Sequence, residues 1–224
     1  MNEQTIVQGL QIPRYYTREG VSPSTMFTYE RRTSTIKNPD GSTVFTMEDV
    51  EVPLSWSQVA TDILAQKYFR KAGVPLRNER DELLLDENGK VITGRETSIK
   101  QVAHRIAGCW RVWGEKYGYF ASARDAQIFY EEMVYMIIGQ YAAPNSPQWF
   151  TTGLHFAYGI TGPAQGHSYV DPDTKKLEYS QDAYSRSQPH ACFIQSINDD
   201  LVTSGGIFSL LTREARIFKY GSGT

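Results

Sequence analysis

Cys192 is the residue best suited to chemistry, because a thiol can bind a metal or exchange with a second thiol. It follows His190 and Ala191 at the start of a segment, 192–197, whose composition favours a β-strand. Side chains alternate along a strand, so His190 and Cys192 are expected on one face. The alternative is that Cys192 is a small buried hydrophobic residue, which the type of residue alone favours.

A zinc site is a further interpretation of His190 and Cys192. A structural zinc ion normally takes four protein ligands. The other residues that could complete such a set are His104, Cys109, His155 and His167. We therefore predict no metal site in this chain.

Ser146 lies between two prolines in Pro144-Asn145-Ser146-Pro147. Prolines fix the backbone and remove amide donors, so the Ser146 hydroxyl could be held toward a ligand. The alternative, which the spacing alone favours, is a rigid connection from a helix to a strand.

Charged residues stand at two later connections. In Asn198-Asp199-Asp200, either aspartate could cap the next helix, or its carboxylate could bind a ribose hydroxyl. Lys219 precedes the sequence Gly221-Ser222-Gly223. A P-loop would place its glycines before a helix, and here they follow one, so that motif is absent. Glycine amides and Lys219 could still bind phosphate from a flexible loop.

Hydrophobic spacing and turn signals predict the elements that carry these residues. Residues 26–36 and 43–52 flank an Asn-Pro-Asp-Gly turn, which predicts a β-hairpin. Residues 1–24 are expected to form an irregular arm, 78–94 a charged surface excursion, and 165–189 a loop with a turn at 171–173.

Four helices are predicted from capping residues and apolar spacing. The first is capped by Ser55 or Ser57 and would bury Val59, Ile63, Leu64 and Tyr68. The second begins at Thr97 or Ser98, the third extends from near Ser122 to about Gln140, and the last covers 207–220. This order predicts an α/β fold, α+β at the amino terminus. A mainly helical module with a hairpin occupies 1–143, and the beginning of an α/β domain that the chain does not complete occupies 144–224.

Composition excludes several classes of protein. The 224 residues are 40% hydrophobic, and 23 Lys and Arg balance 25 Asp and Glu, which gives no general attraction to nucleic acid or anionic membranes. Two cysteines are too few for a disulfide framework. No secretory signal or run of 18 apolar residues is present, so we expect a cytoplasmic location without a membrane partner.

Four stretches in order resemble class II, adenosylcobalamin-dependent ribonucleotide reductases of the long bacterial type. They are NPDGSTVFTMEDVEVPLSWSQVATDILAQKYFRKAGVP, YAAPNSPQWFTTGLHFAYGI, QPHACFIQSINDDL and REARIFKYGSGT. The resemblance extends from about Arg18 to Thr224 and is weakest over residues 78–95.

The resemblance implies a ten-stranded α/β barrel and an enzyme that converts ribonucleotides to 2'-deoxyribonucleotides for DNA synthesis by thiyl-radical chemistry. Adenosylcobalamin generates the radical in that family. Two further cysteines supply the reducing electrons and form a disulfide, and Cys192 matches the first of that pair. By resemblance the enzyme is a ribonucleoside-diphosphate reductase, although the sequence does not distinguish diphosphate from triphosphate substrates.

The resemblance also implies roles for other residues. Ser146, Ala191 and Cys192 match substrate-binding positions. Asp199 matches the carboxylate of the effector site, with Asp200 as an alternative, and Lys219 lies near that site's first flexible loop. No family motif includes Cys109, which we interpret as a core residue.

The implied partners are a ribonucleotide substrate, a dNTP or ATP effector, a thioredoxin-type reductant and the remainder of the reductase chain, with a homodimer as an open alternative. The family's radical cysteine, its second reducing cysteine and most cobalamin-binding residues have no counterpart in these residues, so we expect the chain to be inactive alone. The other candidate function is a non-catalytic nucleotide-binding or regulatory module that associates with a separate reductase chain.

Overall fold

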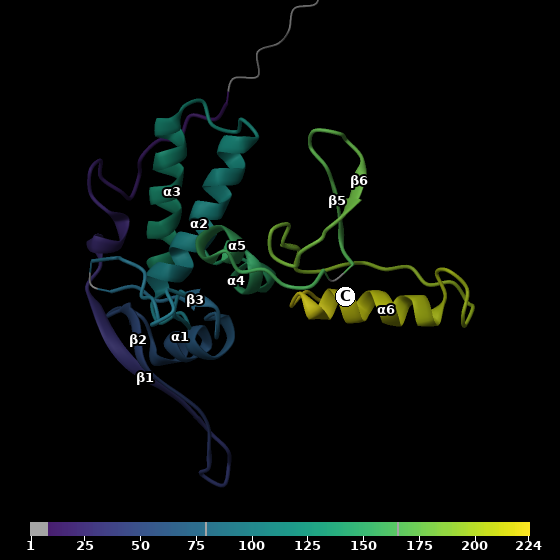
Figure 1. The fold of residues 1–224 in the computed structure, drawn as a ribbon, viewed down its shortest axis with the longest axis horizontal. Helices are drawn as coiled ribbons and strands as arrows, with labels where there is room; N and C mark the ends of the chain where they lie inside the picture. Colours follow the sequence, from purple (N-terminus) through teal and green to yellow (C-terminus); the bar gives the residue numbers. More distant parts are fainter. Residues whose placement is uncertain (1–8, 79, 165) are drawn as a thin grey trace, which may run out of the picture. The chain divides into compact units, whose positions relative to one another are not determined.

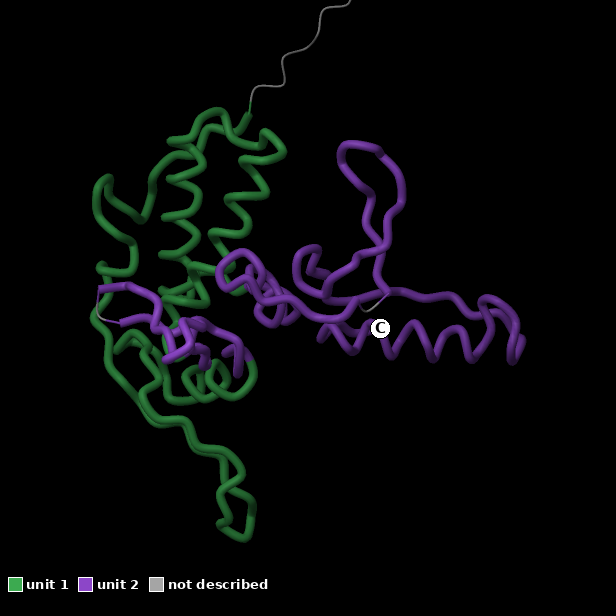
Figure 2. Tube along the Cα trace, in the orientation of Figure 1, with its two compact units in different colours: residues 1–67, 97–143 green, residues 68–96, 144–224 purple. Residues whose placement is uncertain are grey.

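We describe the protein from a computed structural model, which describes residues 9–78, 80–164 and 166–224. The described chain combines helices with short antiparallel sheets, so the predicted mixed α/β class is confirmed. The backbone divides into two compact units (Figure 2). Unit 1 comprises residues 1–67 and 97–143, and unit 2 comprises 68–96 and 144–224.

The predicted hairpin is present in unit 1. Strand β1 (Tyr29–Lys37) pairs antiparallel with β2 (Thr43–Pro53), and the long ribbon is visible in Figure 1. Met47, Val50 and Val52 on β2 are buried, because this side of the strand faces the core. The pairing shifts from Arg32 with Val50 to Ser34 with Met47, which places one extra residue, a bulge, in β2.

Two long helices, α2 (Ile99–Lys116) and α3 (Ala123–Ile138), pack together in unit 1 (Figure 1). Ser98 caps α2 through a capping box with Gln101, and Ser122 caps α3 by accepting a hydrogen bond from the Asp125 amide. Both starts were among those predicted. Ile99, Val102 and Ile106 are fully buried and recur at three- and four-residue spacing, as an amphipathic helix requires.

The helix before them begins as predicted, with Ser57 as the cap of α1 (Gln58–Ile63). It continues into one π-helical turn, η2 (Leu64–Tyr68). The predicted apolar face is partly wrong, since Val59 and Ile63 are 67% and 47% exposed, whereas Thr61 is buried. Thr61 can be buried because its hydroxyl forms two hydrogen bonds: it donates to the Ser57 carbonyl and accepts from the Arg32 guanidinium.

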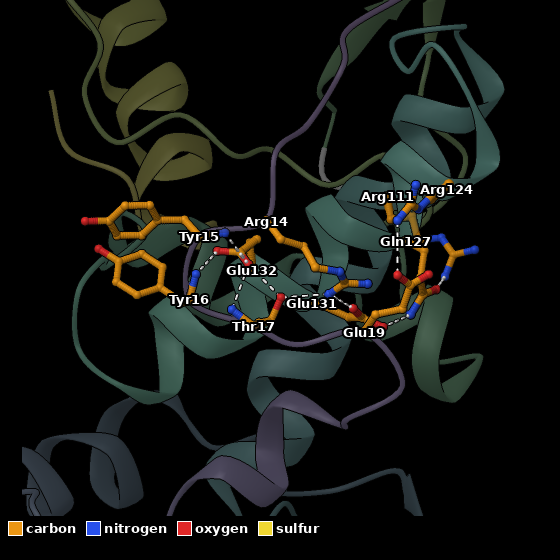
Figure 3. A network of polar contacts seen from close by, with 10 residues as sticks. All are labelled: Arg14, Tyr15, Tyr16, Thr17, Glu19, Arg111, Arg124, Gln127, Glu131 and Glu132. Carbon is orange, nitrogen blue, oxygen red and sulfur yellow. Dashed lines mark hydrogen bonds and ion pairs between the residues drawn. The ribbon is translucent and has the colours of Figure 1, made fainter.

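The amino-terminal arm is anchored to α3 through side-chain carboxylates, although it is irregular as predicted. It includes the short helix η1 (Pro23–Met26), and residues 1–8 of the predicted arm lie outside the described residues. Figure 3 shows Glu132 of α3 accepting hydrogen bonds from the amides of Tyr15, Tyr16 and Thr17 and from the Thr17 hydroxyl, at 2.6–3.1 Å. Arg14 forms an ion pair with Glu131 beside it.

Unit 2 begins with the residues between η2 and α2. Strands β3 (Val74–Pro75) and β4 (Thr93–Gly94) pair, and the described residues 80–90 are exposed, which confirms a charged surface excursion. The second part of unit 2 comprises α4 (Ser146–Thr151), α5 (Leu154–Tyr158), β5 (Ser168–Val170), β6 (Leu177–Tyr179) and α6 (Ile207–Lys219). The last of these helices was predicted.

Two expectations for this part of unit 2 are corrected. Residues 144–147 do not connect a helix to a strand; Ser146 and Pro147 begin α4, because proline is tolerated in the first turn. Residues 165–189 are not wholly loop, since β5 and β6 form a small hairpin. The turn predicted at 171–173 closes it, with the Asp171 carboxylate accepting from the Asp173 and Thr174 amides.

No helix in the described parts of the chain is both long enough and apolar enough to cross a membrane. The described strands form three two-stranded sheets, of which two lie in unit 2.

Candidate functional site

The segment that carries Cys192 is fixed by parallel pairing with the residues that follow α6. The Phe193 amide donates to the Gly223 carbonyl at 2.9 Å, and the Gly223 amide donates to the Ala191 carbonyl at 2.7 Å. These bonds make a parallel bridge between Cys192 and Gly223. The predicted strand is therefore present in the described residues only as this bridge.

Side chains reinforce the pairing on either side of the thiol. The buried Ser222 hydroxyl donates to the His190 carbonyl at 2.5 Å. The Gln195 amide donates to the Thr224 hydroxyl at 3.2 Å. The backbone that holds Cys192 is thus fixed from both ends of the segment.

Exposure alternates along this segment as the sequence predicts. His190, Cys192 and Ile194 are exposed, whereas the alternate residues Phe193 and Gln195 are partly covered. His190 and Cys192 therefore share a face. Cys192 is an exposed free thiol, so its interpretation as a buried hydrophobic residue is wrong.

The other cysteine, Cys109, is 5% exposed within α2, which confirms its assignment to the core. Because one thiol is buried and the other exposed, a reagent for free thiols will react with Cys192 first.

Ser146 begins α4, where its hydroxyl lies 3.1 Å from the Tyr68 hydroxyl. The neighbouring Asn145 caps the helix by accepting from the Gln148 amide, and the Trp149 indole donates to the Pro144 carbonyl at 2.8 Å. Each flanking residue is thus fixed by a specific bond. The Ser146 side chain is half-buried and has a defined orientation.

The ring of Phe150 on α4 lies against Gly221, next to the paired residues 222–224. A Cβ at Gly221 would be 2.5 Å from the ring carbon Cδ2 of Phe150, and Gly221 has a φ of +78°. Only glycine combines this backbone conformation with so close an approach. The Ser146 helix and the partner segment of Cys192 are therefore in contact.

The two aspartates after the cysteine segment have different environments. The Asp200 carboxylate accepts from the amides of Val202 and Thr203 at 2.9 and 2.6 Å and from the Thr203 hydroxyl at 2.7 Å. The Thr203 hydroxyl, followed by these amides, lowers the pKa of Asp200. Asp200 thus closes a turn before α6, whose N-cap is Gly206. Asp199 is exposed and accepts no hydrogen bond from the described residues.

Lys219 is exposed at the carboxyl end of α6, whereas Asp199 precedes the amino end of the same helix. A helix of 13 residues is about 20 Å long, so the structure does not bring these two predicted effector residues together.

Sequence reasoning considered His167 only as a possible zinc ligand and did not foresee its contacts with Arg186 and Tyr220. Its Nε2 lies 2.5 Å from the Arg186 carbonyl and its Nδ1 lies 2.6 Å from the Tyr220 hydroxyl. Because a carbonyl only accepts, Nε2 carries a proton and donates to the Arg186 carbonyl. Nothing local in the sequence connects residues so far apart, so this link could not have been found from spacing.

A second anchor of the same region is Asp182. Its carboxylate accepts from the amides of Gly162, Tyr184 and Ser185. Burial opposes its ionisation, but these hydrogen bonds outweigh burial and lower the pKa of Asp182. It holds the chain in place ahead of the Cys192 segment.

The described residues contain no group of three or more His, Cys, Asp or Glu side chains that could hold a metal ion. The Cys192 segment and the described residues that pair with it offer a thiol and backbone groups, and we assign adenosylcobalamin to none of them.

The profile of the class II vitamin B12-dependent ribonucleotide reductase family matches residues 30–140. The curated vitamin B12-dependent ribonucleotide reductase of Bradyrhizobium diazoefficiens is 53% identical over 96% of this chain and 18% of its own length. That of Agrobacterium fabrum is 52% identical over the same shares, and that of Streptomyces coelicolor is 33% identical over 96% of this chain and 17% of its length.

The chain spans less than a fifth of the length of these curated relatives, and the part matched is their amino-terminal part. The match extends over 96% of this chain, which confirms the resemblance found from its motifs. The chain belongs to the family of class II vitamin B12-dependent ribonucleotide reductases.

Proposed function

We propose that this chain is the amino-terminal part of an enzyme that reduces ribonucleotides to 2'-deoxyribonucleotides, and that Cys192 supplies reducing electrons. The observation that carries the proposal is the exposed thiol of Cys192 on a segment fixed by residues 222–224. A reducing thiol must be accessible and rigidly placed. Cys109 is buried and therefore not accessible, and it lies outside the family's motifs.

In the proposed reaction, Cys192 and a second thiol outside these residues are oxidised to a disulfide. They release two electrons and two protons, which replace the ribose 2'-hydroxyl by hydrogen with loss of water. A thioredoxin-type reductant then returns the disulfide to two thiols by exchange. Bound adenosylcobalamin would supply the radical that starts this chemistry.

Substrate contacts are proposed for Ser146 and for the backbone at Ala191. The contact of Phe150 with Gly221 supports this pairing, because it joins the Ser146 helix to the partner segment of Cys192. The bond from Tyr68 orients the Ser146 hydroxyl, so little side-chain freedom would be lost when a substrate binds.

Asp199 and Lys219 are proposed to bind a dNTP or ATP effector. Of the two aspartates, Asp199 is favoured because the Asp200 carboxylate is already occupied by its turn. Since Asp199 and Lys219 flank opposite ends of α6, we propose that they contact different groups of the effector.

The ten-stranded barrel is part of the same proposal. Ile194, beside Cys192, is fully exposed, and such an apolar side chain on a paired segment favours packing against further strands of the reductase. The remainder of the reductase is therefore the expected partner, and homodimerisation would follow its assembly.

The experiment is a chimera in which these 224 residues replace the matching part of the Bradyrhizobium diazoefficiens reductase. In the chimera, Cys192→Ser should lower multiple-turnover deoxynucleotide formation by roughly 100-fold or more, because a serine has the shape of the cysteine but cannot form the disulfide that the proposed reaction requires. Cobalt–carbon bond cleavage, followed by absorbance, should be unchanged.

Cys109→Ser is the matched control and should retain turnover, since a serine in a helix can bond its own backbone. Sustained turnover of the Cys192→Ser chimera with thioredoxin would show that Cys192 is not a reducing thiol.

A further inference from the structure

A cavity of about 270 Å³ lies in unit 2 between the Cys192 segment and α6. Phe193 and Gln195 line it from the cysteine segment, and Arg213, Arg216 and Tyr220 line it from the helix. The cavity therefore lies behind the thiol, on the covered side of the segment, and is distinct from the face that exposes Cys192.

Arg213 has unused hydrogen-bonding capacity in this cavity. One terminal nitrogen, Nη2, donates to the Ser196 carbonyl at 3.1 Å. Its Nε is buried and has no hydrogen-bond partner among the described residues. A buried donor without an acceptor is costly. An anion in the cavity toward which the guanidinium turned would give this donor an acceptor.

Arg216 follows one helical turn after Arg213 and is exposed at the same cavity. Two guanidinium groups at a spacing of three residues lie on one side of a helix. Their planar forks suit an oxyanion, to which each can donate two parallel bonds.

The other polar side chains of the lining include two amides and one imidazole. Gln188 and Gln195 contribute the amides, and His167 donates from Nε2 to the Arg186 carbonyl. None of the described lining residues is Asp or Glu, so no carboxylate neutralises the two arginines within the cavity.

The size of the cavity limits the ligand. Pockets for small molecules usually measure about 300–1,000 Å³, and this one lies just below that range. A compact anion fits it better than a whole nucleotide.

We propose that this cavity binds a compact oxyanion, either free phosphate or the phosphate group of a small metabolite, through Arg213 and Arg216. A bound anion links α6 to Phe193 and Gln195, and thereby holds the segment that carries Cys192. The site is separate from the proposed substrate and effector contacts, so it stands or falls independently of them.

The experiment titrates the 224-residue chain with inorganic phosphate at low ionic strength, by calorimetry. Arg213→Gln and Arg216→Gln should each weaken phosphate binding by roughly 10-fold or more, since a hydrogen bond to a charged group contributes about 1.5–3 kcal/mol. Arg216→Gln is the safer variant, because Arg213 also bonds the Ser196 carbonyl. Lys176→Gln removes the same charge outside the cavity and should leave binding within about twofold.

Phosphate should also slow the reaction of Cys192 with a thiol reagent in the wild-type chain and not in Arg216→Gln. A parallel titration with ribose 5-phosphate identifies the source: tighter binding than phosphate indicates a phosphorylated metabolite, and equal binding indicates free phosphate. Absence of saturable binding, or equal weakening by Lys176→Gln, would overturn the proposal.

Discussion

The carboxylate of Glu132 fastens the amino-terminal arm to α3. It is 8% exposed and accepts four hydrogen bonds from residues 15–17. Burial alone would disfavour its charge, but the Thr17 hydroxyl and the three amides outweigh burial and lower the pKa of Glu132. The hydrogen bonds from the folded arm therefore favour the ionised form of Glu132.

Glu132→Gln should lower the free energy of unfolding by about 2 kcal/mol, because the amide replaces one charged acceptor oxygen by a donor that faces backbone N–H groups. Urea denaturation followed by circular dichroism measures this change. Glu48→Gln on the exposed part of β2 is the matched control and should change stability by less than about 0.5 kcal/mol.

The contribution of Glu132 to the free energy of unfolding should decrease as the pH falls into the acid range. A carboxylate whose pKa is lowered by folding stabilises the protein fully above its ordinary pKa, and the stabilisation is lost as the pH falls through the folded value. The stability difference between wild type and Glu132→Gln should therefore be constant near neutral pH and shrink in acid. A difference independent of pH down to the acid limit would contradict this role.

At the scale of elements, the contact between Phe150 of α4 and Gly221 couples two segments that are distant in sequence. Gly221→Ala places a methyl group against the ring and also forces an L-residue to a φ of +78°. The backbone effect alone costs about 1–2 kcal/mol. The amides of Phe193 and Gly223, which form the bridge at Cys192, should then exchange with solvent faster than in the wild type.

Gly89→Ala separates the two effects, because Gly89 has a similar φ of +76° but nothing within 4 Å of an added Cβ. It should leave exchange at Phe193 and Gly223 unchanged. If both variants altered exchange equally, the packing of Phe150 would not be the cause.

Helix starts were predictable from sequence because capping is local. Ser57, Ser98 and Ser122 each accept a hydrogen bond from an amide within three residues, so the capping residue and its partner are neighbours in the sequence. The buried side of α1 was not predictable, since it depends on Arg32 reaching Thr61 from another element. The short β5–β6 hairpin was missed because its strands lack apolar alternation.

For the candidate site too, local features were predictable from the sequence and contacts between distant residues were not. The sequence identified Cys192 and its shared face with His190, because alternation is local. It did not reveal the pairing of Cys192 with Gly223, which joins residues on either side of a helix. Arg213 and Arg216 were not singled out, since arginines on an amphipathic helix usually face solvent.

At the scale of the whole chain, residues 68–96 belong to unit 2 although helices of unit 1 flank them in sequence. The buried Glu96 accepts from the Arg70 amide at 2.7 Å and from the Tyr158 hydroxyl at 2.8 Å. Ile160 also lies within 3.4 Å of the position that a Cβ on Gly73 would occupy. The segment 68–96 is therefore held by residues beyond 143.

A chain that ends at Ala143 should consequently be cut by protease within 68–96, while 9–67 and 97–143 remain resistant as unit 1. In the 224-residue chain the same segment should be cut more slowly. Limited proteolysis with peptide mapping compares the two. Equal resistance of 68–96 in both chains would refute the division and favour a self-contained module over 1–143.

The pairing of Cys192 with Gly223 also orders events during synthesis. A ribosome adds about 5–20 residues per second, so the thiol segment emerges on the order of seconds before its partner does. During that interval the bonds from Ser222 and Gly223 do not exist, and the nascent thiol has no fixed backbone. Cys192 is thus open to oxidation or to chaperone capture on the ribosome, and it acquires its final geometry only after α6 has been made.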